Sequence, residues 1–175
     1  MSESYSPIED IDSKPEYVFR IAKWLELADL KFLPLRDKRD GAYTFLLRWK
    51  DSPDYFVEID SEGKYFSLFS NVITSLKDQE PEKIIAFWGK ATAPNMQYCP
   101  VKIAYDEETG TLRAFLRLYW FEVTGELFVR LVKSVAEFLN DLAKITEELG
   151  LPEIWRETEG EPRSERKPNW DRLFA

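Results

Sequence analysis

Few residues in this 175-residue chain are suited to catalysis, because the sequence contains no histidine and a single cysteine. The absence of histidine excludes Ser-His-Asp and Cys-His couples, an imidazole general base and histidine-ligated zinc or haem. An enzyme would be left with carboxylate, lysine, tyrosine or thiol chemistry. We therefore expect a protein that is not an enzyme and that has neither a cofactor nor a metal site.

Cys99 and two acidic turns are the remaining candidates for reactive or metal-binding groups. Cys99 lies between Tyr98 and Pro100, where no neighbour in sequence is placed to favour its thiolate, so its expected role is that of a small buried apolar residue. The acidic turns at residues 60–62 and 106–108 lack the regular oxygen-ligand spacing of a calcium loop. Turn formation explains both segments without a metal.

The sequence favours contact with another macromolecule along residues 111–123, TLRAFLRLYWFEV. Successive side chains of a β-strand point to opposite faces of the sheet. One face of this segment is apolar and consists of Leu112, Ala114, Leu116, Leu118 and Trp120. The other alternates basic and aromatic residues: Arg113, Phe115, Arg117, Tyr119 and Phe121. Aromatic residues and arginine are enriched in protein interfaces, so this second face is the candidate protein interface.

Two other interpretations of this face stay open. A solvent-facing strand has the same composition when arginine stems cover neighbouring aromatic rings. A nucleic-acid platform would stack bases on the aromatic side chains, but the net charge of −8 repels a polyanion. The alternation recurs on the strand that contains Trp49, so we add Trp49 to the candidate interface, although the register between the two strands cannot be read from sequence.

The last 25 residues, 151–175, contain three prolines and 11 charged residues, which predicts a poorly ordered tail. At its end, Trp170, Leu173 and Phe174 have the spacing of one face of a short helix. These three side chains are candidates for docking into a groove on a partner or on the same domain. Packing of the tail on itself is the alternative.

Apolar residues at three- and four-residue steps predict three helices that support these surfaces. The first opens at the capping box formed by Ser13 and Glu16 and ends near residue 30. The second opens at Pro81, with Ile84, Ile85 and Trp88 as its apolar positions, and stops before Pro94. The last runs from Thr124, an expected N-cap, to about residue 150.

The strands are predicted from aromatic and β-branched segments bounded by turn residues. There are five, at residues 43–50, 55–59, 64–69, 97–105 and 112–122. Residues 32–41, with Pro34 and a charged run, are predicted to be a connection. The resulting order predicts an α+β fold in which helices pack on one face of an antiparallel five-stranded sheet, with residues 1–150 as a single domain.

This order of elements, together with four short features, resembles the YbjN-type family, whose members are similar to the class I chaperones of type III secretion systems. The features are GKYFSLFSNVI at residues 63–73, Asn95 after the second helix, YDEETGTL at 105–112 and VTGELF at 123–128. The resemblance covers about residues 13–150. It implies a small acidic protein, commonly dimeric, that binds other polypeptides or acts in regulation and has no catalytic residues.

These observations predict a chaperone-like or regulatory module that forms a homodimer and binds another polypeptide. One cysteine, the lack of a signal-peptide pattern and the lack of a long apolar run predict a cytoplasmic protein without a membrane or nucleic-acid partner. A small-molecule-sensing domain with an aromatic pocket is the alternative. An enzyme that uses carboxylate or thiol chemistry is the third hypothesis.

Overall fold

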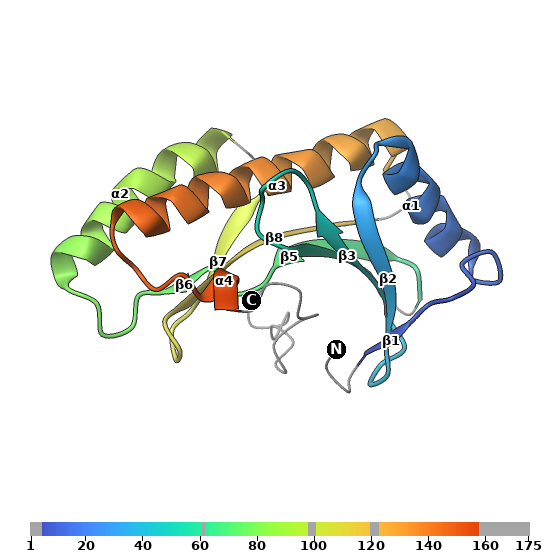
Figure 1. Ribbon diagram of the computed structural model, residues 1–175, viewed down its shortest axis with the longest axis horizontal. Helices are drawn as coiled ribbons and strands as arrows, with labels where there is room; N and C mark the ends of the chain where they lie inside the picture. The colour runs from blue at the N-terminus through green and yellow to red at the C-terminus, as the bar shows by residue number, and fades with distance from the viewer. Residues whose placement is uncertain (1–4, 61, 98–100, 120–122, 158–175) are drawn as a thin grey trace.

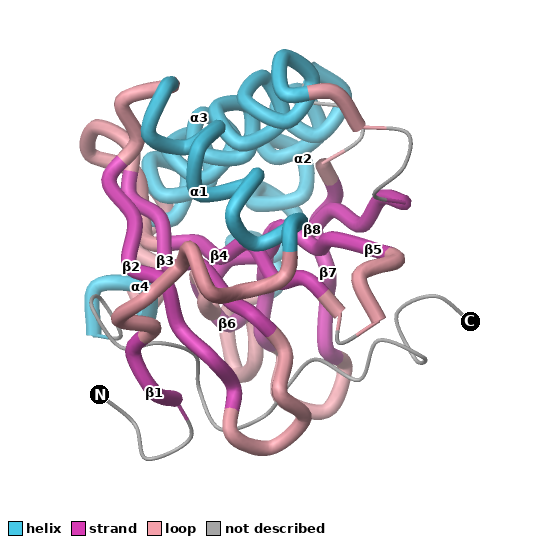
Figure 2. Tube along the Cα trace, turned by 90° about the vertical axis from the view of Figure 1, so that its right-hand side faces the viewer, coloured by secondary structure: helices cyan, strands magenta, loops and turns pink. Residues whose placement is uncertain are grey.

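The computed structural model describes residues 5–60, 62–97, 101–119 and 123–157. Figure 1 and Figure 2 show one twisted antiparallel sheet with three helices gathered on one of its faces. These helices are α1 (Glu16–Leu27), α2 (Pro81–Gln97) and α3 (Gly125–Glu148), and α4 (Ile154–Glu157) is a single turn. The predicted α+β class, with helices on one face of an antiparallel sheet, is confirmed.

The described residues form eight strands, not the five predicted. Those that correspond to predicted strands are β3 (Tyr43–Arg48), β4 (Tyr55–Ile59), β5 (Tyr65–Ser70), β7 (Lys102–Asp106) and β8 (Thr111–Tyr119). The additional strands are β1 (Tyr5–Pro7), β2 (Lys31–Asp37) and β6 (Thr74–Ser75). Strands β1, β2, β3, β4, β5 and β8 are neighbours in that order, and β6 and β7 both pair with β8.

The strand β2 replaces most of the segment that we predicted to be a connection, and it lies between β1 and β3. Pro34 is tolerated there because it lies just beyond the end of β1 at Pro7, where its carbonyl accepts a hydrogen bond from the Ile8 N–H at 3.1 Å and its own nitrogen needs no ladder bond. The charged residues that follow form the turn into β3, in which the Arg39 N–H donates to Asp37 Oδ1 at 2.9 Å. The charged run therefore marks a hairpin turn and not a long loop.

The first helix begins without the predicted capping box. It opens at Glu16 directly after Pro15, and no side chain caps its N-terminus. The Ser13 hydroxyl donates instead to the carbonyl of Asp10 at 3.1 Å, within the preceding turn. The predicted capping box is wrong because the Ser13 hydroxyl forms its hydrogen bond within the preceding turn and not with the helix N-terminus.

The other helix ends agree with the prediction in part. Thr124 caps α3 as expected, because its Oγ1 accepts a hydrogen bond from the Leu127 N–H at 3.2 Å. The predicted end of α2 is wrong, since the helix continues through Pro94 to Gln97. The φ angle of proline suits a helix. Its missing N–H donor and the clash of its ring with the preceding turn disfavour Pro94 inside the helix without forbidding it.

The main core lies between the sheet and helices α1, α2 and α3. Phe45 of β3, Phe66 of β5 and Phe128 of α3 are fully buried in it. The predicted apolar face of β8 points into the same core, where Leu112, Ala114 and Leu116 are buried and Leu118 packs against them. The apolar residues at three- and four-residue steps of α3, which form its apolar seam, are also buried from Phe128 to Ile145.

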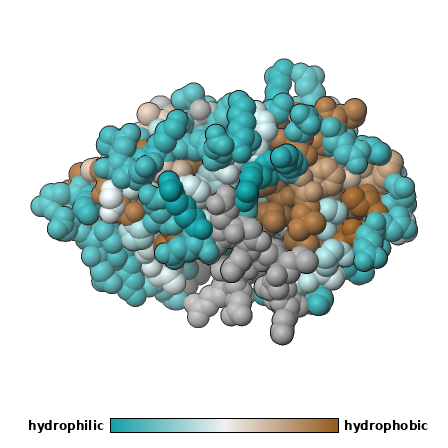
Figure 3. Space-filling model, in the orientation of Figure 1, coloured by the Kyte–Doolittle hydropathy of each residue, from teal (hydrophilic) through white to brown (hydrophobic). Residues whose placement is uncertain are grey.

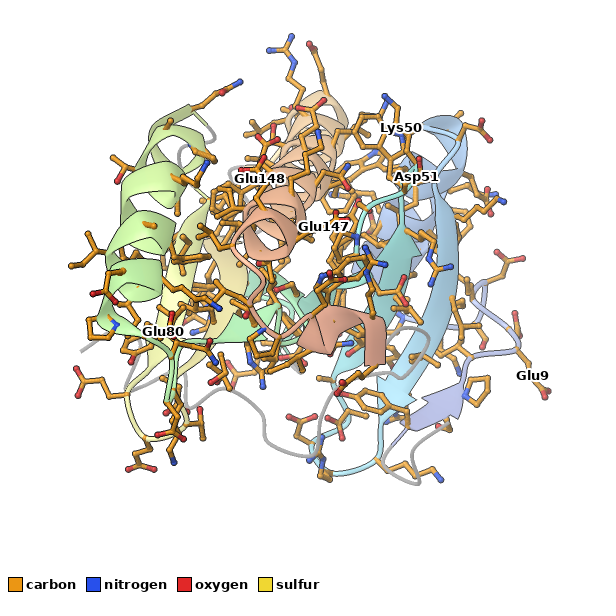
Figure 4. All side chains as sticks on the ribbon, turned by 60° about the vertical axis from the view of Figure 1, so that its left-hand side comes forward. Glu9, Lys50, Asp51, Glu80, Glu147 and Glu148 are labelled. Atoms are coloured by element: carbon orange, nitrogen blue, oxygen red, sulfur yellow. The ribbon has the colours of Figure 1, made fainter. Side chains whose placement is uncertain are left out.

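Two contacts hold the end of α3 and the residues that follow it. Lys90 Nζ of α2 lies 2.9 Å from Glu148 Oε2 of α3, the residue labelled on the last turn of that helix in Figure 4. Leu151 is buried in the core and Trp155 of α4 packs against it, although both belong to the segment that we predicted as a tail. The packed domain thus includes α4.

Candidate protein interface

The candidate interface lies on the face of the sheet opposite α1, α2 and α3, which we call the helix-free face. Along β8 the residues that point toward the helices are Leu112, Ala114 and Leu116. The alternate residues of the same strand therefore lie on the helix-free face: Arg113, Phe115, Arg117 and Tyr119. The two faces predicted for this strand are separated as expected.

Strand register aligns four apolar side chains in a line across the helix-free face. Leu46 of β3, Phe56 of β4, Phe69 of β5 and Phe115 of β8 are successive cross-strand partners, and we call these four residues the apolar row. The rings of Phe56 and Phe69 stack with centroids 5.3 Å apart and an interplanar angle of 20°. The three phenylalanines form a cluster separate from the main core, against which Leu46 and Ala104 pack.

A second line of side chains lies two residues further along the same strands. Thr44, Glu58, Ser67 and Arg117 are successive partners, and we call them the polar row. Arg117 Nε donates to Ser67 Oγ at 3.1 Å, and Thr44, Glu58 and Ser67 are buried. The Thr44 hydroxyl has no hydrogen-bond partner among the described residues. One buried carboxylate, one half-buried guanidinium and two buried hydroxyls thus run beside the apolar row.

One end of the helix-free face is aromatic and exposed. The rings of Tyr65 and Tyr119, which are cross-strand partners, have centroids 5.1 Å apart. The Arg117 guanidinium lies over the Tyr65 ring, 5.2 Å from its centroid. Tyr119 is 52% exposed. We call Tyr65, Arg117 and Tyr119 the aromatic-cationic end of the face.

The hydropathy surface in Figure 3 shows a further apolar area over β2 and β3. Exposed Leu33 of β2 and half-buried Leu46 of β3 are cross-strand partners on these strands. Sequence analysis missed Leu33, since β2 was not predicted. It also missed Leu46, Phe56 and Phe69, although the alternation of residues 43–48 placed Leu46 on the same face as Thr44.

Trp49, also predicted for the interface, does not join these residues. It follows Phe45 and Leu47 at two-residue spacing and packs against the main core on the helix-covered face. Lys133 Nζ of α3 lies 5.6 Å from the Trp49 ring centroid, and Lys50 Nζ lies 4.3 Å from it. The alternation recognised two faces on this strand, but the aromatic residues belong to the covered one.

An open pocket of about 460 Å³ lies at the end of β3, next to α4. It is lined by Arg48, Lys50, Asp51, Ser52, Trp155 and Arg156, of which Figure 4 labels Lys50 and Asp51. Arg48 Nε lies 2.7 Å from Oδ1 of buried Asp54, and Arg156 pairs with Glu153. A lining with one aromatic residue and five polar or charged ones differs from the aromatic pocket predicted for a small-molecule sensor.

A separate apolar surface lies where α2 meets strand β7, and we call it the α2–β7 surface. Ile85 and Trp88 of α2 and Tyr105 of β7 are exposed, and the Trp88 and Tyr105 rings meet edge to face at 6.2 Å. Within the described residues β7 pairs with β8 alone, so its other edge presents unpaired backbone groups. Ile85 and Trp88 were predicted as apolar positions of α2, and the structure places both at the surface.

Two further features are absent from the described part of the chain. It contains no group of three or more acidic, cysteine or histidine side chains placed to hold a metal ion. None of its helices combines the length and apolar character needed to cross a bilayer. Cys99, Phe121, Trp170, Leu173 and Phe174, which were also considered as site residues, lie outside the described residues.

Comparison with known proteins identifies similar folds but no family. Neither a protein-family model nor a curated protein matches the sequence. An uncharacterized protein from Methanothermobacter thermautotrophicus is similar in structure, with a TM-score of 0.58 and 13% identity, over 77% of this chain and 99% of that chain. A chain of the heterodimeric ExoU–SpcU complex of the Pseudomonas aeruginosa type III secretion system has a TM-score of 0.50 and 18% identity, over 71% of this chain and 96% of that chain.

YbjN from E. coli also matches, with a TM-score of 0.45 and 18% identity, over 77% of this chain and 93% of that chain. Both groups named in the predicted resemblance are therefore among the structural matches. We base the fold assignment on the first two structures, and at these identities the similarity concerns the fold alone. The chain thus has the α+β fold found in a type III secretion complex, with the helix-free face of its sheet as the candidate site.

Proposed function

We propose that the protein is a non-enzymatic, chaperone-like or regulatory module that binds another polypeptide through the helix-free face. The observation that carries this proposal is the juxtaposition on one face of the apolar row, the polar row and the exposed aromatic-cationic end. Such a surface provides apolar area and directed polar groups together, which is the composition of an interface core. We also propose a cytoplasmic location, which the single cysteine predicts.

The geometry suggests how a polypeptide would be held. Apolar side chains of the partner would pack on exposed Leu33, half-buried Leu46 and the Tyr119 ring, which are the accessible apolar groups of this face. Arg117 is fixed beside Ser67 and Tyr65, so its guanidinium is ordered before a partner carboxylate arrives. Tyr119, exposed at the edge of this arrangement, would make the first contact.

The similar structure from a heterodimeric type III secretion complex supports a polypeptide as the bound molecule. A homodimer is part of the same proposal, and the α2–β7 surface supports it. Exposed Ile85, Trp88 and Tyr105 and the open edge of β7 would be covered by a second copy. Dimerisation there would leave the helix-free face available to the partner.

Site-specific photo-crosslinking tests the binding face. A benzophenone amino acid replaces Tyr119 in the full chain, and a control replaces Leu127 of α3, which is 40% exposed on the helix layer. In extract of the source organism we expect one or a few polypeptides to crosslink at position 119 and not at 127. Equal crosslinking at both positions would contradict binding through the helix-free face.

Size-exclusion chromatography with light scattering tests the homodimer. We expect a dimer for the full chain and a monomer for Ile85→Asp, because a carboxylate at this 73% exposed position would be desolvated in the α2–β7 contact. A monomer for the unchanged chain would overturn the homodimer and leave the binding face untouched.

A further inference from the structure

We propose that strand β7 pairs antiparallel with the β7 strand of a second copy, centred on Ala104, so that one continuous sheet carries two helix-free faces on the same side. This inference rests on the function proposed above, because it gives the proposed homodimer a defined geometry. It depends on the sequence of β7, KIAYD at residues 102–106, which is complementary to itself in that orientation.

The first support is the position of β7 at the end of the sheet. Phe115 of β8 has Phe69 of β5 as one cross-strand partner and Lys102 of β7 as the other, so β5 and β7 lie on opposite sides of β8. No further strand of the described residues pairs with β7. Figure 1 shows α2 and α1 at opposite ends of the helix layer, and α2 meets β7 through the contact of Trp88 with Tyr105. The outer edge of β7 therefore presents backbone N–H and C=O groups to which another strand can bind.

Symmetry restricts how two copies of β7 can pair. Identical strands pair antiparallel about a two-fold axis perpendicular to the sheet, and this axis keeps the helices of both copies on one side. Opposite residues of the two strands then lie on the same face, whereas successive residues alternate between faces. The axis must therefore pass through a residue and not between two residues. An axis at Ala104 pairs all five residues of β7, whereas an axis at Ile103 or Tyr105 pairs only residues 102–104 or 104–106.

The second support is the complementarity of the register centred on Ala104. Lys102 lies opposite Asp106 of the second copy on the helix-free face, which is the face of Phe115, the partner of Lys102 in β8. Symmetry repeats this pair on the other side of the axis. Ile103, which packs against the main core, lies opposite Tyr105 of the second copy on the helix-covered face. Pairs of opposite charge, and pairs of an aromatic with a β-branched residue, stabilise neighbouring strands.

The other two registers lose this complementarity. An axis at Ile103 places Lys102 opposite Ala104, and an axis at Tyr105 places Asp106 opposite Ala104. Charged residues on an edge strand disfavour indiscriminate pairing. The register that brings opposite charges together is therefore the one selected.

The carboxylate of Asp106 is held in place before a second copy arrives. Its Oδ1 accepts hydrogen bonds from the N–H of Glu108 at 2.9 Å and from the N–H of Thr109 at 3.2 Å. A carboxylate has about four acceptor sites, so the group keeps capacity for the ammonium of exposed Lys102. One member of the pair is thus ordered already, which reduces the entropy that pairing costs.

The same symmetry fixes the direction of the two binding faces. Strand β7 pairs with β8 only as far as Phe115, whereas Arg117 and Tyr119 of the aromatic-cationic end lie further along β8, beyond the paired segment. Each copy thus keeps a complete site of its own. Because the axis is perpendicular to the sheet, both sites open to the same side of the dimer.

Disulfide trapping in the full chain tests this register. Each variant also carries Cys99→Ser, so that it contains a single thiol. Ala104→Cys places two thiols opposite each other, with Cα atoms roughly 4.5–5.5 Å apart, which a disulfide can bridge. Lys102→Cys is the matched control, since the two copies of residue 102 would lie about 14 Å apart. With oxidised glutathione as oxidant, we expect at least roughly ten-fold more disulfide-linked dimer from Ala104→Cys than from Lys102→Cys.

Ile103→Cys and Tyr105→Cys test the opposite face of the sheet. Either variant alone should form little linked dimer, because the Cα atoms that carry its two thiols would lie about 8 Å apart, beyond the reach of a disulfide. An equimolar mixture of the two variants should give the mixed disulfide, which mass spectrometry identifies. The inference is overturned if Ala104→Cys links no better than Lys102→Cys, or if the mixture links no better than the separate variants.

Lys102→Glu tests the charge pair without a new bond. The substitution sets two carboxylates against each other on each side of the axis, so the dimer dissociation constant, measured by light scattering on dilution, should rise about ten-fold. Lys31→Glu of β2, near the other end of the sheet, changes the net charge equally and should leave the dissociation constant unchanged. Equal effects of the two substitutions would overturn the register.

The outcomes separate this inference from the proposed function. A dimer in solution that forms no disulfide at position 104 would retain the homodimer and reject the pairing of β7. A monomer would reject both, whereas crosslinking of a polypeptide at position 119 tests the binding face independently. Conversely, a trapped dimer in a protein that crosslinks no polypeptide would retain the β7 pairing and reject the proposed function.

Discussion

Arg117 of β8 lies over the ring of Tyr65 of β5, with the guanidinium carbon 5.2 Å from the ring centroid. The same guanidinium donates through Nε to Ser67 Oγ at 3.1 Å, so a long and flexible side chain is held in one orientation. An ordered arginine loses less entropy on binding than a free one. This pair makes the aromatic-cationic end the part of the helix-free face best prepared for a partner.

The double variant Arg117→Glu with Tyr119→Ser should remain folded and lose association with the partner. The substitution reverses one charge and removes one exposed ring, so we expect affinity to fall by at least roughly ten-fold, or about 1.4 kcal/mol. Titration calorimetry with the polypeptide that crosslinking identifies measures this loss of affinity. The free energy of unfolding in urea should change by about 1 kcal/mol or less, since both positions are incompletely buried.

Ile85→Asp is the matched control for this measurement, because it changes an exposed residue on the α2–β7 surface. We expect its affinity for the partner to equal that of the unchanged chain. Unaltered affinity of the double variant, with intact folding, would show that this end of β8 is an ordinary solvent-facing surface.

Trp49→Ala should reduce stability without reducing partner affinity. Trp49 packs against the main core, and Lys133 of α3 lies near its ring, so truncation leaves a cavity between β3 and the helix layer. We expect a loss of roughly 2–4 kcal/mol in urea unfolding followed by circular dichroism. Lys133→Met, which removes only the cation, should cost about 0.5–1 kcal/mol. A weaker partner affinity of Trp49→Ala at unchanged stability would show that Trp49 belongs to the interface.

The behaviour of Trp49 also shows how far the sequence predicts this site. Alternation along β8 separated Leu116 from Arg117 correctly, because one face of that strand is wholly apolar. On β3 both faces carry large apolar residues, Phe45 on one and Leu46 on the other. Periodicity then identifies two faces without saying which one the helices cover, and that depends on contacts distant in sequence.

The fold shows the same division between local and distant information. The apolar seam of α3 and its cap at Thr124 are local, and the structure confirms both. Strands β1 and β6 have three and two residues, which is too short for a period to appear. They exist because a neighbouring strand offers backbone groups to pair with. The strand β2 was missed because Pro34 is compatible with it only next to the end of β1.

Gly110→Ala should destabilise the β7–β8 hairpin strongly. Gly110 has a φ of +68°, and an added Cβ would lie 2.7 Å from the backbone nitrogen of Lys77. Strain in φ and a clash with backbone act together, so we expect a loss of about 2 kcal/mol or more in urea unfolding. Gly89→Ala is the matched control, because nothing lies within 4 Å of its added Cβ in the middle of α2. That variant should gain about 0.5–1 kcal/mol, and equal effects of the two substitutions would contradict this account.

Tyr55→Phe should make the protein less sensitive to alkaline pH. Tyr55 is fully buried, its hydroxyl has no hydrogen-bond partner among the described residues, and burial raises the pKa of the phenol well above its ordinary value. Below a pH of about 10 the phenol is neutral in both the folded and the unfolded chain. Above it the unfolded chain ionises while the folded chain keeps its proton, so the free energy of unfolding falls as pH rises.

The phenylalanine variant lacks this ionisation, so its stability should decline less between neutral and strongly alkaline pH. Partial burial also raises the pKa of Tyr17, but that residue is present in both proteins and cancels in the comparison. At neutral pH the variant should be as stable as the unchanged chain or up to about 1 kcal/mol more stable, because an unsatisfied buried hydroxyl is removed. Thermal unfolding of both proteins across this pH range tests the prediction. Parallel stability curves would mean that Tyr55 ionises in the folded protein, or that its hydroxyl is solvated there.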